Sequence, residues 1–110
     1  MVQYSLSEKR KPTYDLDAFK DACSTPEKMN ITGTALDTAA DIGFTRQNIV
    51  EVIQTMIRVH FYKSMTSHAD HRAWQDVYHV PSEAGVLYVK FTADAVTDFR
   101  VLSFKEKDNG

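Results

Sequence analysis

The spacing of apolar residues changes once along this 110-residue chain, close to His60. Before this point apolar residues recur every three to four positions, which is typical of helices with one buried face. After it, aromatic and β-branched residues alternate with polar ones, which is typical of strands. Because the helical patterns all come first and none separates the strands, the sequence predicts an α+β fold with an antiparallel sheet.

Three helices are predicted in the first half of the chain, over residues 14–28, 32–44 and 45–60. Pro26 cannot continue a helix, so the first is expected to stop there. Gly43 marks the end of the second, because glycine readily adopts the left-handed conformation that follows a helix. Thr45 is the expected N-cap of the third. The apolar stripe of this third helix is predicted to be core and comprises Ile49, Val52, Ile53, Met56 and Ile57.

Four strands are predicted in the second half, over residues 60–67, 73–80, 85–92 and 98–107. Side chains alternate between the two faces of a strand, so if Leu87 and Val89 point at the helices, Tyr88 and Lys90 must point away. The inward residues of the second strand are predicted to be Trp74, Asp76 and Tyr78, with the two rings in the core and the carboxyl group hydrogen-bonded or at the rim.

The outer face of the predicted sheet carries positive charge and a phenol. Alternation allows Lys63, Gln75, Tyr88 and Lys105 to share this face. Lysines suit phosphate groups, a glutamine amide suits the edge of a base, and an aromatic ring suits stacking, which together is the chemistry of a single-stranded RNA site. The pattern leaves open a second interpretation, a solvated face with scattered polar residues.

Length and composition predict one domain over residues 1–110, with a flexible arm at 1–12 and a loose tail at 108–110. The net charge is −2, so a polyanion partner requires local positive charge. Cys23, the one cysteine, excludes an intramolecular disulfide and fits a reducing compartment, so the expected location is the cytoplasm. No segment has the roughly eighteen apolar residues of a membrane span, so no membrane contact is expected.

Four histidines invite a zinc site, and His68 and His71 have a spacing that could chelate a metal. Structural zinc sites usually hold four Cys or His ligands at recognisable spacing, and Cys23 is the only cysteine that could join them. We therefore expect no metal site and no cofactor.

Three motifs in a fixed order resemble the MqsR toxin family: FYKSMT at 61–66, WQDVY at 74–78 and SFKEK at 103–107. The close resemblance covers about half of the chain and extends more loosely into the helical region. It implies a RelE-like α+β fold, with about three N-terminal helices packed on one face of a mainly antiparallel C-terminal sheet. It also implies that the catalytic residues are Lys63, Gln75, Tyr88 and Lys105, the set that alternation places on the outer face.

The same resemblance implies the toxin of a type II toxin–antitoxin system, a ribosome-independent endoribonuclease (mRNA interferase) that cleaves single-stranded mRNA at GC-containing triplets. The implied partner is a zinc-binding, MqsA-like antitoxin, and operator DNA would be bound only through that partner. Two alternatives stay open. One is a non-catalytic RNA-binding or antitoxin-titrating regulator on the same fold, and the other is a purely structural interaction domain.

Cleavage without a metal would use the ribose 2′-oxygen to attack the adjacent phosphorus, giving a 2′,3′-cyclic phosphate and a 5′-hydroxyl. Lys63 and Lys105 suit charge neutralisation, Tyr88 suits phosphate orientation or proton donation, and Gln75 suits contact with a base or the sugar. One of two neighbouring lysines is a candidate base, since each cation disfavours protonation of the other. His71 is a competing candidate for proton transfer, because histidine ordinarily titrates near neutral pH.

Overall fold

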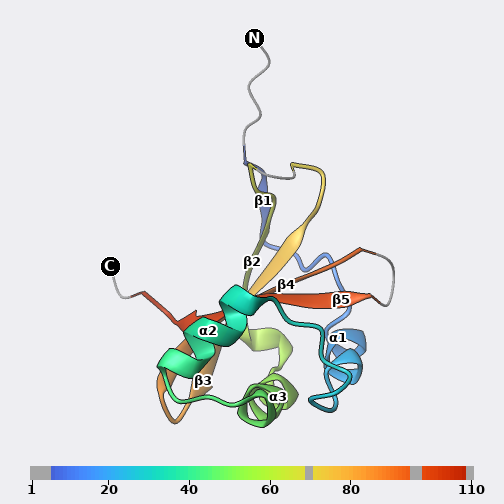
Figure 1. Cartoon of the computed structure of the whole chain (residues 1–110). Helices are drawn as coiled ribbons and strands as arrows, with labels where there is room; N and C mark the ends of the chain where they lie inside the picture. Colours follow the sequence, from blue (N-terminus) through green and yellow to red (C-terminus); the bar gives the residue numbers. More distant parts are fainter. Residues whose placement is uncertain (1–5, 69–70, 95–97, 109–110) are drawn as a thin grey trace.

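The computed structural model describes residues 6–68, 71–94 and 98–108 of the chain. Its helices are α1 (Leu16–Ala22), α2 (Gly33–Asp41) and α3 (Arg46–Thr55), followed by a 3₁₀ turn at Arg58–His60. Its strands are β1 (Glu8–Lys9), β2 (Phe61–Met65), β3 (Gln75–Ser82), β4 (Gly85–Ala93) and β5 (Phe99–Glu106). The predicted α+β fold is confirmed, since the helices precede the long strands of an antiparallel sheet (Figure 1).

Each helix begins where a side chain caps its first turn. The side chains of Asp15, Thr32 and Thr45 accept hydrogen bonds from backbone N–H groups in the first turns of α1, α2 and α3. Thr45 is therefore the N-cap that the sequence predicts. Gly43, with φ of 84°, lies just beyond α2 as expected. The first helix is shorter than predicted. It ends at Ala22, before Pro26.

The third helix also ends earlier than its apolar pattern predicts. Met56, just after α3, has extended backbone angles (φ −63°, ψ 136°), and its carbonyl accepts a hydrogen bond of 2.9 Å from the Lys20 ammonium group. This change of direction turns Ile57 out to solvent, with 52% of its surface exposed. The prediction that Ile57 lies in the core is wrong. The remaining members of the stripe are buried as predicted: Ile49, Val52, Ile53 and Met56.

Within the described residues, the strands pair antiparallel in the order β1-β2-β3-β4-β5. A two-residue turn joins β3 to β4, and Gly85, with φ of 96°, follows it in a conformation that favours glycine. The pairing register shifts in two places, between Phe61 and Lys63 in β2 and between Lys90 and Phe91 in β4. These shifts interrupt the strict alternation of side chains.

The N-terminal arm predicted at residues 1–12 is partly a strand. Glu8 and Lys9 form β1 and pair with Met65 and Ser64 at the edge of β2. Strand pairing satisfies backbone groups at a sheet edge, and this long-range interaction leaves little trace in local composition. Residues 1–5 of the predicted arm lie outside the described residues. In Figure 1 β1 and the end of β2 extend away from the helices, toward the top of the view.

The core lies between the helices and one face of the sheet. Phe19 of α1 stacks on Phe91 of β4, with ring centroids 3.6 Å apart and planes 3° from parallel. Leu87, Val89 and Tyr78 are fully buried, as alternation predicts. No helix in the described ranges is both long and apolar enough to cross a membrane.

Asp76 and Trp74 were also predicted to point toward the helices, and only the prediction for Asp76 is confirmed. Asp76 is fully buried and hydrogen-bonded as expected, because it accepts from the backbone N–H groups of Thr13 and Tyr14. Trp74 was predicted as a core ring, but it is only half-buried, and the Lys9 ammonium lies 4.3 Å from its ring centroid. Trp74 precedes β3, so strand alternation does not control its direction.

Candidate functional site

The pairing register places the predicted site residues on one face of the sheet. Lys63 of β2 lies opposite Val77 of β3, which lies opposite Lys90 of β4. Tyr88 of β4 lies opposite Lys105 of β5. Because residues two apart on a strand share a face, one surface, opposite the helices, carries all four predicted residues: Lys63, Gln75, Tyr88 and Lys105.

Tyr88 and Lys105 form a direct cross-strand pair. The Lys105 ammonium lies 5.3 Å from the Tyr88 ring centroid, within the range of a cation–π contact. Burial raises the pKa of the Tyr88 phenol, and the charge of Lys63 lowers it by a smaller amount. The phenol therefore stays protonated near neutral pH and can donate a hydrogen bond or a proton.

Lys63 is held in place by the unpredicted strand β1. Its ammonium lies 2.6 Å from Oε1 of Glu8, and this hydrogen bond lowers the pKa of the Glu8 carboxyl. Glu8 is well exposed whereas Lys63 is not, so the pair orients Lys63 at the sheet surface and offsets part of its positive charge.

Gln75 lies farther from the others than a compact site would require. It begins β3, and roughly 13 Å of extended strand separates it from His79, which lies opposite Tyr88. Its side chain is only 9% exposed, and its Oε1 atom has no hydrogen-bond partner among the described residues. An unpaired buried amide oxygen is costly in free energy, so this atom is a ready acceptor for a donor brought by a ligand.

Lys90 occupies the middle of the face and was not predicted as a site residue. It is half-buried on β4, an interior strand between β3 and β5, two residues from Tyr88. Burial lowers the pKa of the Lys90 ammonium, and the charges of Lys105 and Lys63 lower it further. Alternation had already placed Lys90 on the outer face, so its position was readable from the sequence. The sequence did not show that Lys90 lies close enough to Lys105 and Lys63 for their charges to lower its pKa.

A hollow of about 400 Å³ opens beside the Tyr88–Lys105 pair. The side chains of Tyr62 and His79 form another part of its wall. Burial lowers the pKa of His79, and the charges of Lys107 and Lys63 lower it further, so His79 is neutral near pH 7. The hollow's complete lining consists of Tyr62, His79, Tyr88, Lys105, Lys107 and Asp108.

His71, the competing proton carrier, lies in the connection between β2 and β3. This connection precedes Gln75, whereas the hollow lies at the His79 end of β3. His71 is not part of the hollow's lining, and the histidine that faces Tyr88 is His79. Sequence reasoning did not single out His79, because it could not read the register between strands.

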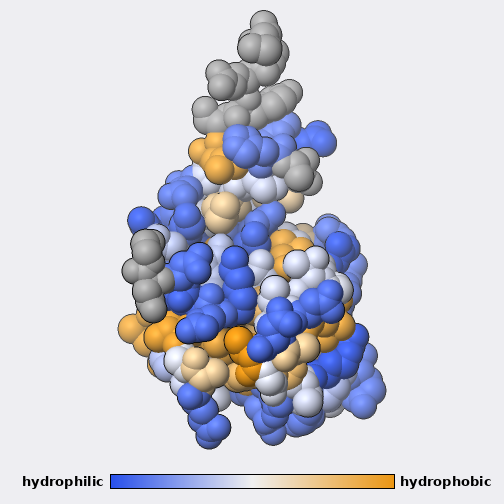
Figure 2. All heavy atoms as spheres, turned by 60° about the vertical axis from the view of Figure 1, so that its left-hand side comes forward, coloured by the Kyte–Doolittle hydropathy of each residue, from blue (hydrophilic) through white to orange (hydrophobic). Residues whose placement is uncertain are grey.

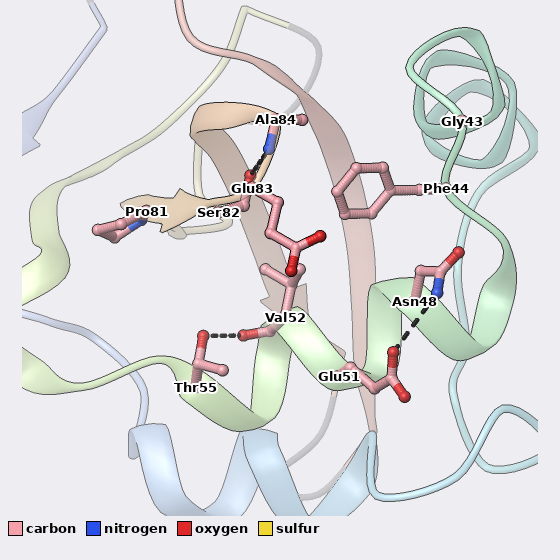
Figure 3. A pocket seen from close by; sticks show the side chains of 10 residues that line it. All are labelled: Gly43, Phe44, Asn48, Glu51, Val52, Thr55, Pro81, Ser82, Glu83 and Ala84. Carbon is pink, nitrogen blue, oxygen red and sulfur yellow. Dashed lines mark hydrogen bonds between the residues drawn. The ribbon is translucent and has the colours of Figure 1, made fainter.

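A larger hollow of about 510 Å³ lies between α3 and the β3–β4 turn. Figure 3 shows the side chain of Glu83 pointing from this turn toward α3, where Glu51 also lines the hollow. Its lining contains two glutamates and no lysine or arginine, so it does not suit a phosphate group. The smaller, lysine-lined hollow is the better candidate site for a polyanion.

The described residues contain no group of three or more His, Cys, Asp or Glu side chains that could hold a metal ion. On the side of the molecule drawn in Figure 2, hydrophilic residues cover most of the surface and apolar residues form smaller areas between them. The side chains at the candidate site supply ammonium, phenol, imidazole, amide and carboxyl groups.

Comparison with known proteins identifies the family. The sequence model of the family described as "Motility quorum-sensing regulator, toxin of MqsA" matches residues 11–106. A protein of Escherichia coli (strain K12) named mRNA interferase toxin MqsR is 36% identical over 100 residues, which covers 91% of this chain and 99% of that protein. The resemblance carried by the three sequence motifs is confirmed, and the chain belongs to the MqsR toxin family.

Proposed function

We propose that this protein is an mRNA interferase, an endoribonuclease that cleaves single-stranded mRNA at GC-containing triplets and acts as the toxin of a type II toxin–antitoxin system in the cytoplasm. The E. coli relative, which the chain matches over nearly its full length, bears the name mRNA interferase toxin. The observation that carries the proposal is the Tyr88–Lys105 pair, which shares one sheet face with Lys90 and Lys63. Such a face offers several cations to a chain of phosphates, despite the net charge of −2.

The proposed reaction is a metal-independent transesterification. A base removes the proton from a ribose 2′-hydroxyl, and the 2′-oxygen attacks the adjacent phosphorus. The bond from phosphorus to the 5′-oxygen breaks, and that oxygen takes up a proton. The products are a 2′,3′-cyclic phosphate and a 5′-hydroxyl, and the protein must stabilise the added negative charge at the phosphorane between these steps.

The site residues divide these tasks by their surroundings. Lys90 is the proposed base, because burial and two neighbouring cations lower its pKa and increase the neutral amine. Lys105 and Lys63 neutralise phosphorane charge, and the protonated phenol of Tyr88 donates to the leaving oxygen. Gln75, with its unpaired buried oxygen, holds a base or the sugar of a neighbouring nucleotide.

Purified protein is expected to cleave a long single-stranded RNA in the presence of EDTA. Cut sites should fall at GC-containing triplets, and the fragments should carry cyclic phosphate and 5′-hydroxyl ends, as read by end-group labelling and primer extension. RNA that is bound but never cut, with or without added divalent metal, would instead identify a non-catalytic RNA-binding regulator.

Lys90→Arg should reduce the cleavage rate roughly 100-fold, because a guanidinium keeps the charge but does not release a proton. In the wild-type protein the rate should rise with pH up to the pKa of Lys90, which lies below the usual lysine value, and then level off. The variant should lose this rise, measured as a pH–rate profile on a short RNA. An unchanged profile in Lys90→Arg, together with a lost one in His71→Gln, would transfer the role to His71.

The proposed partner is a zinc-binding, MqsA-like antitoxin that brings operator DNA to the complex. The family description itself names this protein type the toxin of MqsA. The proposed edge for strand addition is β2 over residues 61–63, since β1 pairs with only Met65 and Ser64. The Arg10 side chain, which donates to the Tyr62 carbonyl, would have to move aside. Zinc in the purified complex is expected to be bound by the antitoxin.

A further inference from the structure

Three rings lie in a row across neighbouring strands beside the proposed catalytic residues. Tyr62 of β2 stacks on His79 of β3, with ring centroids 4.3 Å apart and planes 23° from parallel. His79 lies directly opposite Tyr88 of β4, with ring centroids 6.1 Å apart and planes tilted by 41°. The mechanism uses Tyr88 alone, so the stacked Tyr62–His79 pair has no assigned role.

The position of Tyr62 results from an irregularity in the sheet. The pairing register shifts between Phe61 and Lys63, and as a result Tyr62 reaches His79 on the outer face. Phe61 packs inward against Tyr78, with ring centroids 5.4 Å apart. The shift leaves Tyr62 40% exposed, which forgoes the free energy of burying an aromatic ring. Such bulges are frequent beside active sites, where they redirect a side chain.

Tyr62 supports the His79 ring on which it stacks. The Tyr62 ring is itself held by the Arg10 guanidinium, which lies 5.2 Å from its centroid. Arg10 is fixed there by a hydrogen bond of 3.0 Å to the Tyr62 carbonyl. Three rings line the hollow, Tyr62, His79 and Tyr88, and Lys105 and Lys107 complete its positively charged part. Its volume of about 400 Å³ lies within the roughly 300–1,000 Å³ typical of small-ligand sites.

We propose that this hollow holds one unpaired nucleobase of the RNA, seated against the supported His79 ring, with the adjoining phosphate at Lys105 and Lys107. This inference rests on the proposed function and adds a specific binding position to it. Stacking suits any base, and the neutral imidazole adds one donor and one acceptor for a base edge. The position lies beside the bond to be cut, because Tyr88 and Lys105 belong to both sites.

The test measures binding of a single-stranded RNA whose riboses are all 2′-O-methylated, so that no 2′-oxygen can attack. Removing one base at a time from this RNA should reveal a position where the loss weakens wild-type binding roughly tenfold at fixed salt. His79→Ala should weaken binding of the intact RNA by a similar factor and should be insensitive to base removal at that position. His79→Phe, which keeps a flat ring, should remain within about threefold of the wild type.

Ile57→Ala is the matched control, because it shortens an exposed apolar side chain outside the hollow and should leave binding unchanged. If His79→Ala does not fold, Tyr62→Ala and the base-removal series on wild-type protein test the same claim. Equal binding of all the base-removed RNAs would overturn the nucleobase position even if the protein cleaves RNA. Absence of cleavage together with a single coupled base would instead refute the proposed function and leave the binding position standing.

Discussion

Lys105→Ala is expected to lower the rate of RNA cleavage by roughly 100- to 1,000-fold, the usual cost of removing one group that stabilises transition-state charge. Lys105 lies directly opposite Tyr88. Its side chain is exposed and lines the hollow, so it takes no part in packing the core. Its removal takes away positive charge where the phosphorane forms. The measurement is a single-turnover rate on a short RNA at saturating protein, which separates chemistry from binding.

Two variants make this result specific. Lys105→Arg keeps the charge and should retain far more activity than Lys105→Ala. Lys28→Ala removes an exposed lysine from the segment between α1 and α2 and should not change the rate. Thermal melting should be similar for all three variants, because Lys105 and Lys28 are both exposed and contribute little to stability. Full activity in Lys105→Ala would contradict the proposed catalytic pair.

Asp76→Ala is expected to lower the free energy of unfolding by about 2–6 kcal/mol, because each of two backbone donors left without its acceptor costs about 1–3 kcal/mol. Asp76 is fully buried and accepts hydrogen bonds from Thr13 N–H (3.0 Å) and Tyr14 N–H (2.9 Å). Without the Asp76 side chain, these two partly buried donors lose their acceptor. The change in free energy is measured by urea unfolding followed by circular dichroism.

Asp76→Asn should cost less than Asp76→Ala, because its amide retains one acceptor oxygen for the two donors. Asp37→Ala, an exposed carboxylate on α2, is the control and should stay within about 0.5 kcal/mol of the wild type. A loss below about 1 kcal/mol in Asp76→Ala would show that the hydrogen bonds of the Thr13–Tyr14 segment add little net stability. The same segment joins β1 to α1, so its release should also loosen the Glu8–Lys63 pair.

Local sequence pattern was enough to place side chains on a face wherever a strand is regular. The alternation of β4 sent Leu87 and Val89 inward and Tyr88 and Lys90 outward, and the structure agrees. This success has a simple cause, since the two-residue period of a strand is a property of its own backbone. Helix starts were equally local, because the side chain of Thr45 caps a backbone N–H three residues away.

The features that the sequence pattern missed depended on interactions between distant segments. Ile57 is exposed because the chain turns at Met56, whose carbonyl bonds to Lys20 of α1. Lys63 is paired with Glu8 because β1 adds to the sheet edge, across 55 positions of sequence.

The sequence by itself determined the fold class, the family and the outward direction of the four predicted residues, since local periods and motifs carry this information. Only the tertiary structure decided which of them are neighbours. The register between strands sets Tyr88 against Lys105 and His79, and it separates Gln75 from that group. A register depends on how whole strands pair and on where bulges shift them, and a local pattern does not encode these long-range choices.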